Sequence, residues 1–376
     1  MFNILKKFLI ILITLAVFLA AALGCVVYFL RDTTTLRIYT INFFDDVYHV
    51  DENELVNYRD GLNYQRLSDD EKYVYSYLYH NTLNNDFLYE LGDDYDSEEI
   101  RAAIEAFLYD WPKYYYINDV TIQSWHNAFY KYTILNIDNQ EEITETIKNI
   151  DDKTETILPE VITDDEYQTI RNIYEYVIDH VEYVKDAECC QDIRSSLLNG
   201  ETVCAGFSKM FQHLAKECGF ECYYVSGIGD KESHAWNLIK LNDNWYWVDT
   251  TYGDKQSVDL YLLCDDDFFL INHTPDESYP ACDDDSMMLK ETNARRFASF
   301  DKNEIKEFID EAVQYGDDYF LFLFNSEEDY QNAYDWLIED RYFETLQRNY
   351  RSLRKTYYIS SAYLPGSHYF YLFFNQ

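Results

Sequence analysis

Basic residues and chain-breaking residues are scarce in this sequence. Its 376 residues include 30 Lys and Arg against 69 Asp and Glu, with only 5 Pro and 11 Gly. A formal net charge of −39 repels phosphate backbones, which excludes nucleic-acid binding, and it disfavours adsorption to anionic lipid surfaces. The low Gly and Pro content excludes collagen-like and low-complexity chains.

Apolar and aromatic residues, in contrast, are plentiful. Hydrophobic residues make up 47% of the chain, and there are 38 Tyr, so a wholly disordered chain is excluded. The length indicates more than one globular unit. We expect a membrane anchor or signal at 1–32, an α+β region at 33–150, a domain carrying chemistry at 155–290, and a small α+β domain at 291–376.

The amino terminus contains one long uncharged run. Lys6 and Lys7 precede Phe8–Leu30, whose 23 residues span about 35 Å as a helix, enough to cross a bilayer. A signal peptide cleaved after Ala20–Ala22 and a lipoprotein site at Cys25 are alternatives. We predict an uncleaved single-pass anchor through residues 8–30, with the amino terminus in the cytoplasm and the rest outside the membrane. Secretion after signal cleavage is the alternative.

The cysteines do not have the spacing of a zinc site. No CxxC pair is matched by a second pair, so we expect no metal. Disulfides are compatible with an exported chain, but their connectivity is not readable from the sequence. The eight cysteines are Cys25, Cys189, Cys190, Cys204, Cys218, Cys222, Cys264 and Cys282.

Cys204 has a context unlike the others, because a helix is expected to begin at or just after it. Apolar residues follow it at the spacing of one buried helical face, and Gly219 ends the pattern. The positive end of a helix dipole favours a thiolate over a thiol. Phe220–Ser226 then alternates like a strand, and Gly227–Ser233 is expected to be a loop.

His234 and Asp249 lie at the two ends of a predicted hairpin. A two-residue turn at Asn242-Asp243 would pair Leu241 with Asn244. His234 and Asp249 would then be diagonal neighbours on one face, about 7–8 Å apart along the backbone. A slip of one residue would move them to opposite faces.

Each of these three residues also has an ordinary structural explanation. A lone Cys is usually a small core residue, a lone His is usually structural, and Asp249 could be a turn residue. Their combination supplies a nucleophile, a base and an orienting acid in the order Cys, His, Asp, which is the arrangement of a thiol enzyme.

Four segments of the sequence resemble the core of the transglutaminase-like superfamily. They are Thr202–Gly206, Cys222–Gly227, His234–Asn237 and Trp245–Tyr252, and the resemblance covers about residues 160–290. It implies an α+β, papain-like fold, in which a helix bearing the cysteine packs on an antiparallel sheet bearing the histidine and the aspartate. The resemblance also makes 155–290 the catalytic domain of a bacterial, membrane-anchored member.

The resemblance implies a role for each site residue. Cys204 is the nucleophile, His234 the base and Asp249 the orienting acid. Gln191 is a candidate oxyanion donor, although an exposed polar residue is an equal interpretation, and we rely first on the backbone N–H at Cys204. Thr202 stands where many bacterial members have Gly, which leaves the local turn open.

Other conspicuous residues have two interpretations. Trp236, Trp247 and Tyr252 could line a substrate cleft or pack in the core. The acidic runs Asp265–Asp267 and Asp283–Asp285 lack the spacing of a calcium loop, so we expect solvated surface charge.

The sequence therefore predicts an extracytoplasmic thiol enzyme that acts on amide bonds through a thioester, with no cofactor. Its expected partners are a protein or peptide substrate at the cell surface and the membrane, not nucleic acid. Hydrolysis is favoured over cross-linking because the resemblance covers only the compact core. Transglutaminase-type cross-linking and a non-catalytic surface module that keeps the fold are the alternatives.

Overall fold

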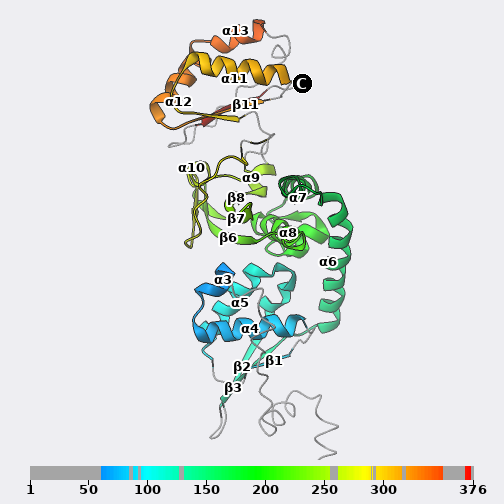
Figure 1. The fold of residues 1–376 in the computed structure, drawn as a ribbon. Coiled ribbons are helices and arrows are strands. Elements are labelled where there is room, and N and C mark those ends of the chain that lie inside the picture. The colour runs from blue at the N-terminus through cyan, green and yellow to red at the C-terminus, as the bar shows by residue number, and fades with distance from the viewer. Residues whose placement is uncertain are drawn as a thin grey trace, which may run out of the picture. The chain divides into compact units, whose positions relative to one another are not determined.

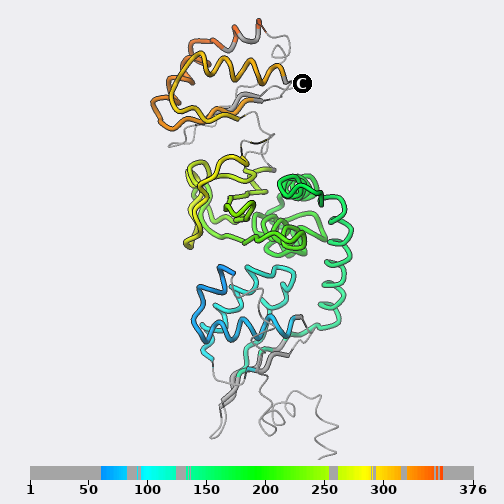
Figure 2. Tube along the Cα trace, viewed as in Figure 1, coloured from blue at the N-terminus to red at the C-terminus, as the bar shows by residue number. Residues whose placement is uncertain are grey.

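The computed structural model describes residues 61–83, 88–91, 95–126, 131–254, 261–288, 290, 294–315, 319–349 and 369–373 (Figures 1 and 2). The predicted anchor at residues 8–30 lies outside these ranges. Within them, the structure contains no helix that combines the length and apolarity needed to cross a bilayer. The chain divides into two compact units, one of residues 1–104 and 119–138 and one of 105–118 and 139–376.

The first unit combines short helices with a three-stranded sheet in the order β1-β3-β2, whose neighbouring strands are antiparallel. Ser68 and Glu71 form a capping box at the start of α4, because each side chain accepts a hydrogen bond from the other residue's backbone N–H. The elements are α3 (Leu62–Arg66), α4 (Asp69–Leu83), β1 (Leu88–Leu91), α5 (Ser97–Asp110, which extends into the second unit), β2 (Thr121–His126) and β3 (Lys131–Asn136).

The segment after α5 is a 3₁₀ helix, η1 (Pro112–Asp119). The alternation of residues at Tyr114–Ile117 predicts a strand, and that prediction is wrong. Tyr115, Tyr116 and Ile117 are all buried, whereas a strand with one solvated face would bury only every second side chain.

The second unit holds the transglutaminase-like pattern, drawn mainly in green in Figures 1 and 2. Helix α8 packs on the sheet strands β6 and β7, and α7 packs against α8 (Figure 1). The elements are α6 (Gln140–Val161), α7 (Glu166–His180), β4 (Glu182–Tyr183), η2 (Arg194–Asn199), β5 (Glu201–Thr202), α8 (Cys204–Glu217), β6 (Cys222–Gly229), β7 (Glu232–Leu241), β8 (Asn244–Val248), α9 (Thr250–Asp254), α10 (Asp266–Phe269) and β9 (His273–Pro275).

Helix α6 is longer than its polar sequence suggested. It runs unbroken through residues 150–155, where we had expected one domain to end and the next to begin. Ile143, Ile150 and Ile157 recur every seven residues and are all buried, so one apolar stripe supports the helix across this region.

The sheet of the second unit has the order β8-β7-β6-β9 with antiparallel neighbours. Leu241 pairs with Asn244, which confirms the predicted hairpin register. Asn242 and Asp243 both have positive φ, as a type I′ turn requires.

The prediction of a loop at Gly227–Ser233 is wrong, because β6 continues to Gly229 and β7 begins at Glu232. Asp230 and Lys231, both with positive φ, make the two-residue turn between them. The glycines that suggested a loop are strand residues, and each leaves room for a large side chain of β7.

The remaining elements form a sheet in the order β10-β11-β12 with helices packed on it. Phe297, Phe308 and Phe322 belong to its buried core. The elements are β10 (Ala294–Phe297), α11 (Lys302–Tyr315), β11 (Tyr319–Phe324), α12 (Glu327–Tyr334), η3 (Asp335–Glu339), α13 (Tyr342–Asn349) and β12 (Tyr369–Phe373). The described chain is thus α+β, as expected.

Candidate active site

Cys204 is the first residue of α8, as the sequence predicted. The preceding residue, Val203, is extended and provides no side-chain cap. The first N–H groups of the helix are therefore not capped by a side chain there, which leaves the Cys204 amide as a candidate oxyanion donor. Cys204 is half-buried and packs with Ala205, Tyr224 and Ala235.

Thr202 and Gly206 fit together beside Cys204. A Cβ atom at Gly206 would lie 1.9 Å from Thr202 Oγ1. The Thr202 hydroxyl in turn lies 2.8 Å from the Cys190 carbonyl and 2.6 Å from Ser195 Oγ. Thr202 therefore takes up the space that the missing side chain of Gly206 leaves and ties the turn before Cys204 to the preceding loop.

The hairpin brings His234 and Asp249 into direct contact. The Nε2 atom of His234 lies 2.7 Å from Asp249 Oδ2. The Cys204 side chain is close enough to the same imidazole to raise its pKa, and since Nε2 faces Asp249, Nδ1 is the nitrogen left for the sulfur. A Cβ atom at Gly229 would lie 2.7 Å from His234 Cδ2, so the absent side chain makes room for the ring.

The charge states of His234 and Asp249 follow from these contacts. Burial lowers the pKa of His234, but the hydrogen bonds to Asp249 and Cys204 outweigh burial and raise that pKa to about 9. Burial opposes ionisation of Asp249, but hydrogen bonds from His234 and His273 outweigh it and hold the pKa of the carboxyl below its usual range. At neutral pH the pair is therefore an imidazolium and a carboxylate.

Asp249 has further partners that the sequence did not reveal. Its Oδ1 atom accepts the backbone N–H groups of Thr251 and Tyr252 at 2.8 and 2.9 Å. Its Oδ2 atom also lies 3.1 Å from Nε2 of a second buried histidine, His273.

These groups are also the place where a metal ion could be considered. Ligand atoms of His234, Asp249 and His273 all lie within 4.8 Å of one another. Both imidazole Nε2 atoms, however, are already hydrogen-bonded to the carboxylate. The contacts therefore describe a hydrogen-bonded cluster.

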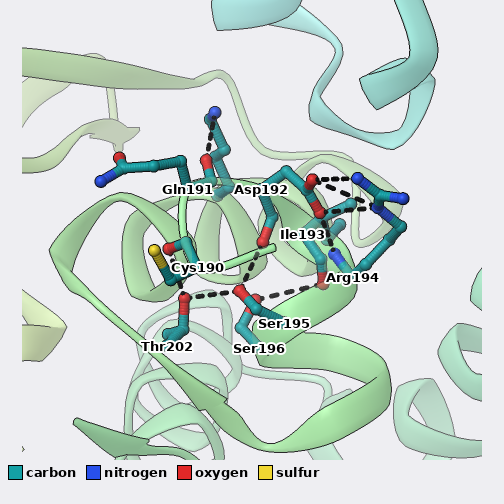
Figure 3. Close-up of polar contacts among 9 residues, drawn as sticks. Cys190, Gln191, Asp192, Ile193, Arg194, Ser195, Ser196 and Thr202 are labelled. Carbon is teal, nitrogen blue, oxygen red and sulfur yellow. Dashed lines mark hydrogen bonds and ion pairs between the residues drawn. The ribbon is translucent and has the colours of Figure 1, made fainter. Parts of the chain in front are cut away.

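Gln191 lies on a loop that is fixed at its backbone (Figure 3). Its carbonyl accepts a hydrogen bond from Lys209 Nζ at 2.7 Å, and the neighbouring Cys190 carbonyl accepts one from Thr202. The Gln191 side chain is exposed and points away from the hydrogen-bonded residues drawn in Figure 3. Its role as an oxyanion donor stays a prediction.

Two of the three proposed cleft residues belong to the core. Trp236 and Trp247 are 0% and 2% exposed, so they do not line an open cleft. They pack with Phe269 behind the imidazoles, because their strand positions point to the buried face. Tyr252 is half-buried, and its ring stacks on His234 with centroids 4.6 Å apart.

Tyr109, from the end of α5, packs with Cys204 in the same small apolar cluster and was not predicted as a site residue. Its ring lies 4.9 Å from that of Tyr224. The backbone here is bonded to α8, because Gln212 Nε2 and Lys216 Nζ each donate to a carbonyl, of Tyr109 and Asp110 respectively, at 2.6 Å. No local pattern in the sequence links this segment to Cys204.

The other described cysteines, Cys189, Cys190, Cys218, Cys222, Cys264 and Cys282, are thiols, as Cys204 is. Cys222 is buried, as expected of a core residue, whereas Cys218 is half-buried at the end of α8. Burial, followed by the charge of Glu217, raises the pKa of Cys218 to about 11. This thiol is a suitable reference for the reactivity of Cys204.

The acidic runs near the site are not simply solvated charge. Asp265 is 6% exposed, caps α10 and binds Arg296, and Asp285 binds the same guanidinium. Asp284 accepts a hydrogen bond from Tyr246. These carboxylates join the site-bearing sheet to the segments that follow it.

Known proteins are similar to the segment that carries these residues. Residues 157–250 match the family model of the Transglutaminase-like superfamily. Kyphoscoliosis peptidase of Homo sapiens is 26% identical over 156 residues, covering 34% of this chain and 23% of the relative, and that of Mus musculus is 22% identical over 126 residues, covering 28% and 19%. The chain thus spans about a fifth of the length of these relatives.

A solved structure described as a TGase aligns with 42% of this chain and 48% of its own at 15% identity, with a TM-score of 0.27. Cys204, His234 and Asp249 all fall within the matched family segment, whereas Tyr109 and His273 lie outside it. Residues 157–250 therefore resemble a transglutaminase-like core, and this segment contains Cys204 together with the bonded pair His234 and Asp249.

Proposed function

We propose that this protein is a thiol hydrolase that cleaves amide bonds in proteins or peptides. The observation that carries the proposal is the 2.7 Å bond between His234 and Asp249, together with a Cys204 side chain near enough to His234 to raise the pKa of that imidazole. A protonated imidazole beside a cysteine, steadied by a buried carboxylate, is the arrangement that generates a thiolate nucleophile.

Each residue has one role in this mechanism. The Cys204 sulfur attacks the carbonyl carbon, the C–N bond breaks, and His234 gives its proton to the leaving amine. The product is a thioester on Cys204. Water then attacks with His234 as base, releasing a carboxylic acid and restoring the thiol. Asp249 holds the imidazole in place throughout, and the Cys204 amide faces the developing oxyanion.

The names of the relatives favour hydrolysis over cross-linking, because both curated relatives are called peptidases. The triad itself supports both reactions, since an amine can replace water in the second step. A location outside the cell membrane is part of the proposal and follows from Lys6, Lys7 and the apolar run at 8–30.

Alkylation tests the catalytic assignment without a known substrate. Iodoacetamide near pH 7 should modify Cys204 at least tenfold faster than Cys218, whose pKa burial raises to about 11. A His234→Ala variant should lose this preference, while Cys218 should react at an unchanged rate. Equal labelling of the two thiols in the unaltered protein would support a non-catalytic binding module instead.

Substrate partitioning separates the two enzymatic alternatives. A peptide substrate is incubated with and without a primary amine, and the acid and amide products are quantified. The proposal expects the acid to dominate in both samples. A dominant amine-containing product would assign cross-linking to the same triad.

A further inference from the structure

The buried carboxylate of Asp249 is shared by two imidazoles. His234 Nε2 lies 2.7 Å from Oδ2, and Nε2 of His273, on β9, lies 3.1 Å from the same oxygen. The other oxygen accepts the two backbone N–H groups of Thr251 and Tyr252. Four donors therefore surround a side chain that is 0% exposed, so its position and charge distribution are set by all four.

His273 is itself held from several sides. Its Nδ1 atom lies 3.2 Å from the Phe269 carbonyl and 2.8 Å from Asn272 Oδ1. Its ring stacks on Phe269 with centroids 3.9 Å apart and meets Trp236 edge-on at 4.9 Å. These contacts hold the ring in place. Because an ionised carboxylate only accepts hydrogen bonds, Nε2 of His273 is the donor to Asp249, while Nδ1 faces two oxygens and donates to them only when it carries a proton as well.

We propose that His273 is a positioning residue for the triad: its second hydrogen bond to Oδ2 fixes the Asp249 carboxylate and draws part of its charge away from His234. This inference rests on the proposed function. The consequence is that the carboxylate holds the His234 proton less tightly than it would with one imidazole alone. A general acid must release its proton to the leaving amine, so the second donor suits the breakdown of the tetrahedral intermediate.

Other titratable groups also face these rings. Cys204 of α8 is near enough to His234 to raise its pKa, and the ring of Tyr252 of α9 stacks on His234 with its centroid 5.0 Å from that of His273. Tyr261 lies 6.0 Å from His273, and Asp230 is bonded to the adjacent Asn272. A substitution at His273 leaves all of these groups in the sequence, so the His234 pKa is compared between proteins that share them.

The test uses the full chain with ¹⁵N-labelled histidine and a metal chelator in every sample. In the unaltered protein, NMR should find a proton on Nε2 of His273 at neutral pH. An Nε2 without a proton overturns the proposal directly, and this measurement requires no variant.

Titration of His234 in two variants then tests the effect on the triad. His273→Phe keeps an aromatic ring but removes the donor, and the pKa of His234 should rise by roughly one pH unit. His273→Gln places an amide N–H near the position of Nε2, so the pKa of His234 in this variant should stay close to its value in the unaltered protein. An unchanged or lowered His234 pKa in His273→Phe overturns the proposal.

Two precautions keep the outcome clear. If His273→Phe does not fold, His273→Leu removes the same donor and is expected to give the same upward shift. The alkylation rate of Cys204 in the unaltered protein is measured in parallel. Slow alkylation of Cys204 would contradict the proposed function. Fast, selective alkylation of Cys204 together with an unchanged His234 pKa in the His273 variants would contradict only the role of His273.

Discussion

At the scale of single residues, the cluster around Asp249 decides what the site can do. A buried carboxylate without partners would become neutral, because burial favours the uncharged form. Asp249 stays ionised because imidazoles and backbone amides surround it. Its charge in turn keeps His234 protonated near neutral pH, so the two groups stabilise each other's ionic forms.

This mutual stabilisation predicts a dependence of stability on pH. His234 has a pKa of about 9 in the folded protein against 6.5 for an ordinary histidine. Its contribution to stability is therefore complete below about pH 6.5 and is lost as the pH rises through about 9. Thermal unfolding of the unaltered protein and of His234→Gln should show a difference in Tm that narrows over this range. A difference that widens with pH would contradict the ionic assignment.

The contact between Thr202 and Gly206 predicts an unusual cost for a helix-favouring substitution. Gly206→Ala should gain about 1 kcal/mol from helix propensity. The added Cβ would lie 1.9 Å from Thr202 Oγ1. We therefore expect the free energy of unfolding to fall by about 1–3 kcal/mol in Gly206→Ala, instead of rising. Chemical denaturation measures this loss. In a Thr202→Gly background the same substitution should be neutral or stabilising, and an equal loss in both backgrounds would refute the steric explanation.

At the scale of the elements, α8 joins Cys204 to the segment that carries Tyr109. Lys216 donates to the Asp110 carbonyl at 2.6 Å, and its ammonium lies 4.4 Å from the centre of the Trp111 ring. One turn earlier, Gln212 bonds the Tyr109 carbonyl. The position of Tyr109 beside Cys204 therefore depends on hydrogen bonds from side chains of α8, the helix that begins at Cys204.

Lys216→Met should loosen this connection, because it removes a donor while keeping an apolar stem. We expect the free energy of unfolding to fall by about 1–3 kcal/mol and the backbone amides of residues 105–118 to exchange with deuterium faster. Lys148→Met is the matched control, since Lys148 forms an exposed ion pair on α6 that contributes little. Equal effects of the two substitutions would argue against the anchoring role of Lys216.

The elements also show how far the sequence predicted the site. The buried stripe of α8 and the Asn242-Asp243 turn are local signals, and both were read correctly together with the register that unites His234 and Asp249. Gly227 and Gly229 were misread as loop residues, because their actual role is to make room for Trp236 and His234 on the neighbouring strand.

The residues that the sequence did not identify come from distant segments. His273 reaches Asp249 from β9, and Tyr109 reaches the Cys204 cluster from α5. Neither contact leaves a periodic signal, since tertiary packing rather than spacing brings the groups together. Trp236 and Trp247 had two interpretations in the sequence, and only their burial decided for the core.

At the scale of the whole molecule, the net charge and the apolar run at residues 8–30 are the basis of the location that we propose, outside the cell membrane and attached to it. The net charge of −39 favours solubility and gives no attraction to anionic membranes, so attachment depends on residues 8–30. The full chain should sediment with membranes, and a variant lacking residues 1–32 should not. Added protease should reach the catalytic core in intact cells whose outer layers have been made permeable.

The truncated variant supplies its own control, because alkylation of Cys204 should be as fast as in the full chain if the core is unaffected. Recovery of the full chain in the soluble fraction would contradict the anchor. Protection of the core in intact cells, with cleavage only after lysis, would contradict its location outside the membrane.

The most direct measurement is intact-protein mass spectrometry during incubation with an excess of peptide substrates under rapid acid quenching. The account predicts a mass increase equal to the acyl portion of the peptide, located on Cys204 by fragmentation, absent from Cys204→Ser and accumulating in His234→Ala only far more slowly. Release of acid product without any such adduct, or an adduct placed on another residue, would contradict the account.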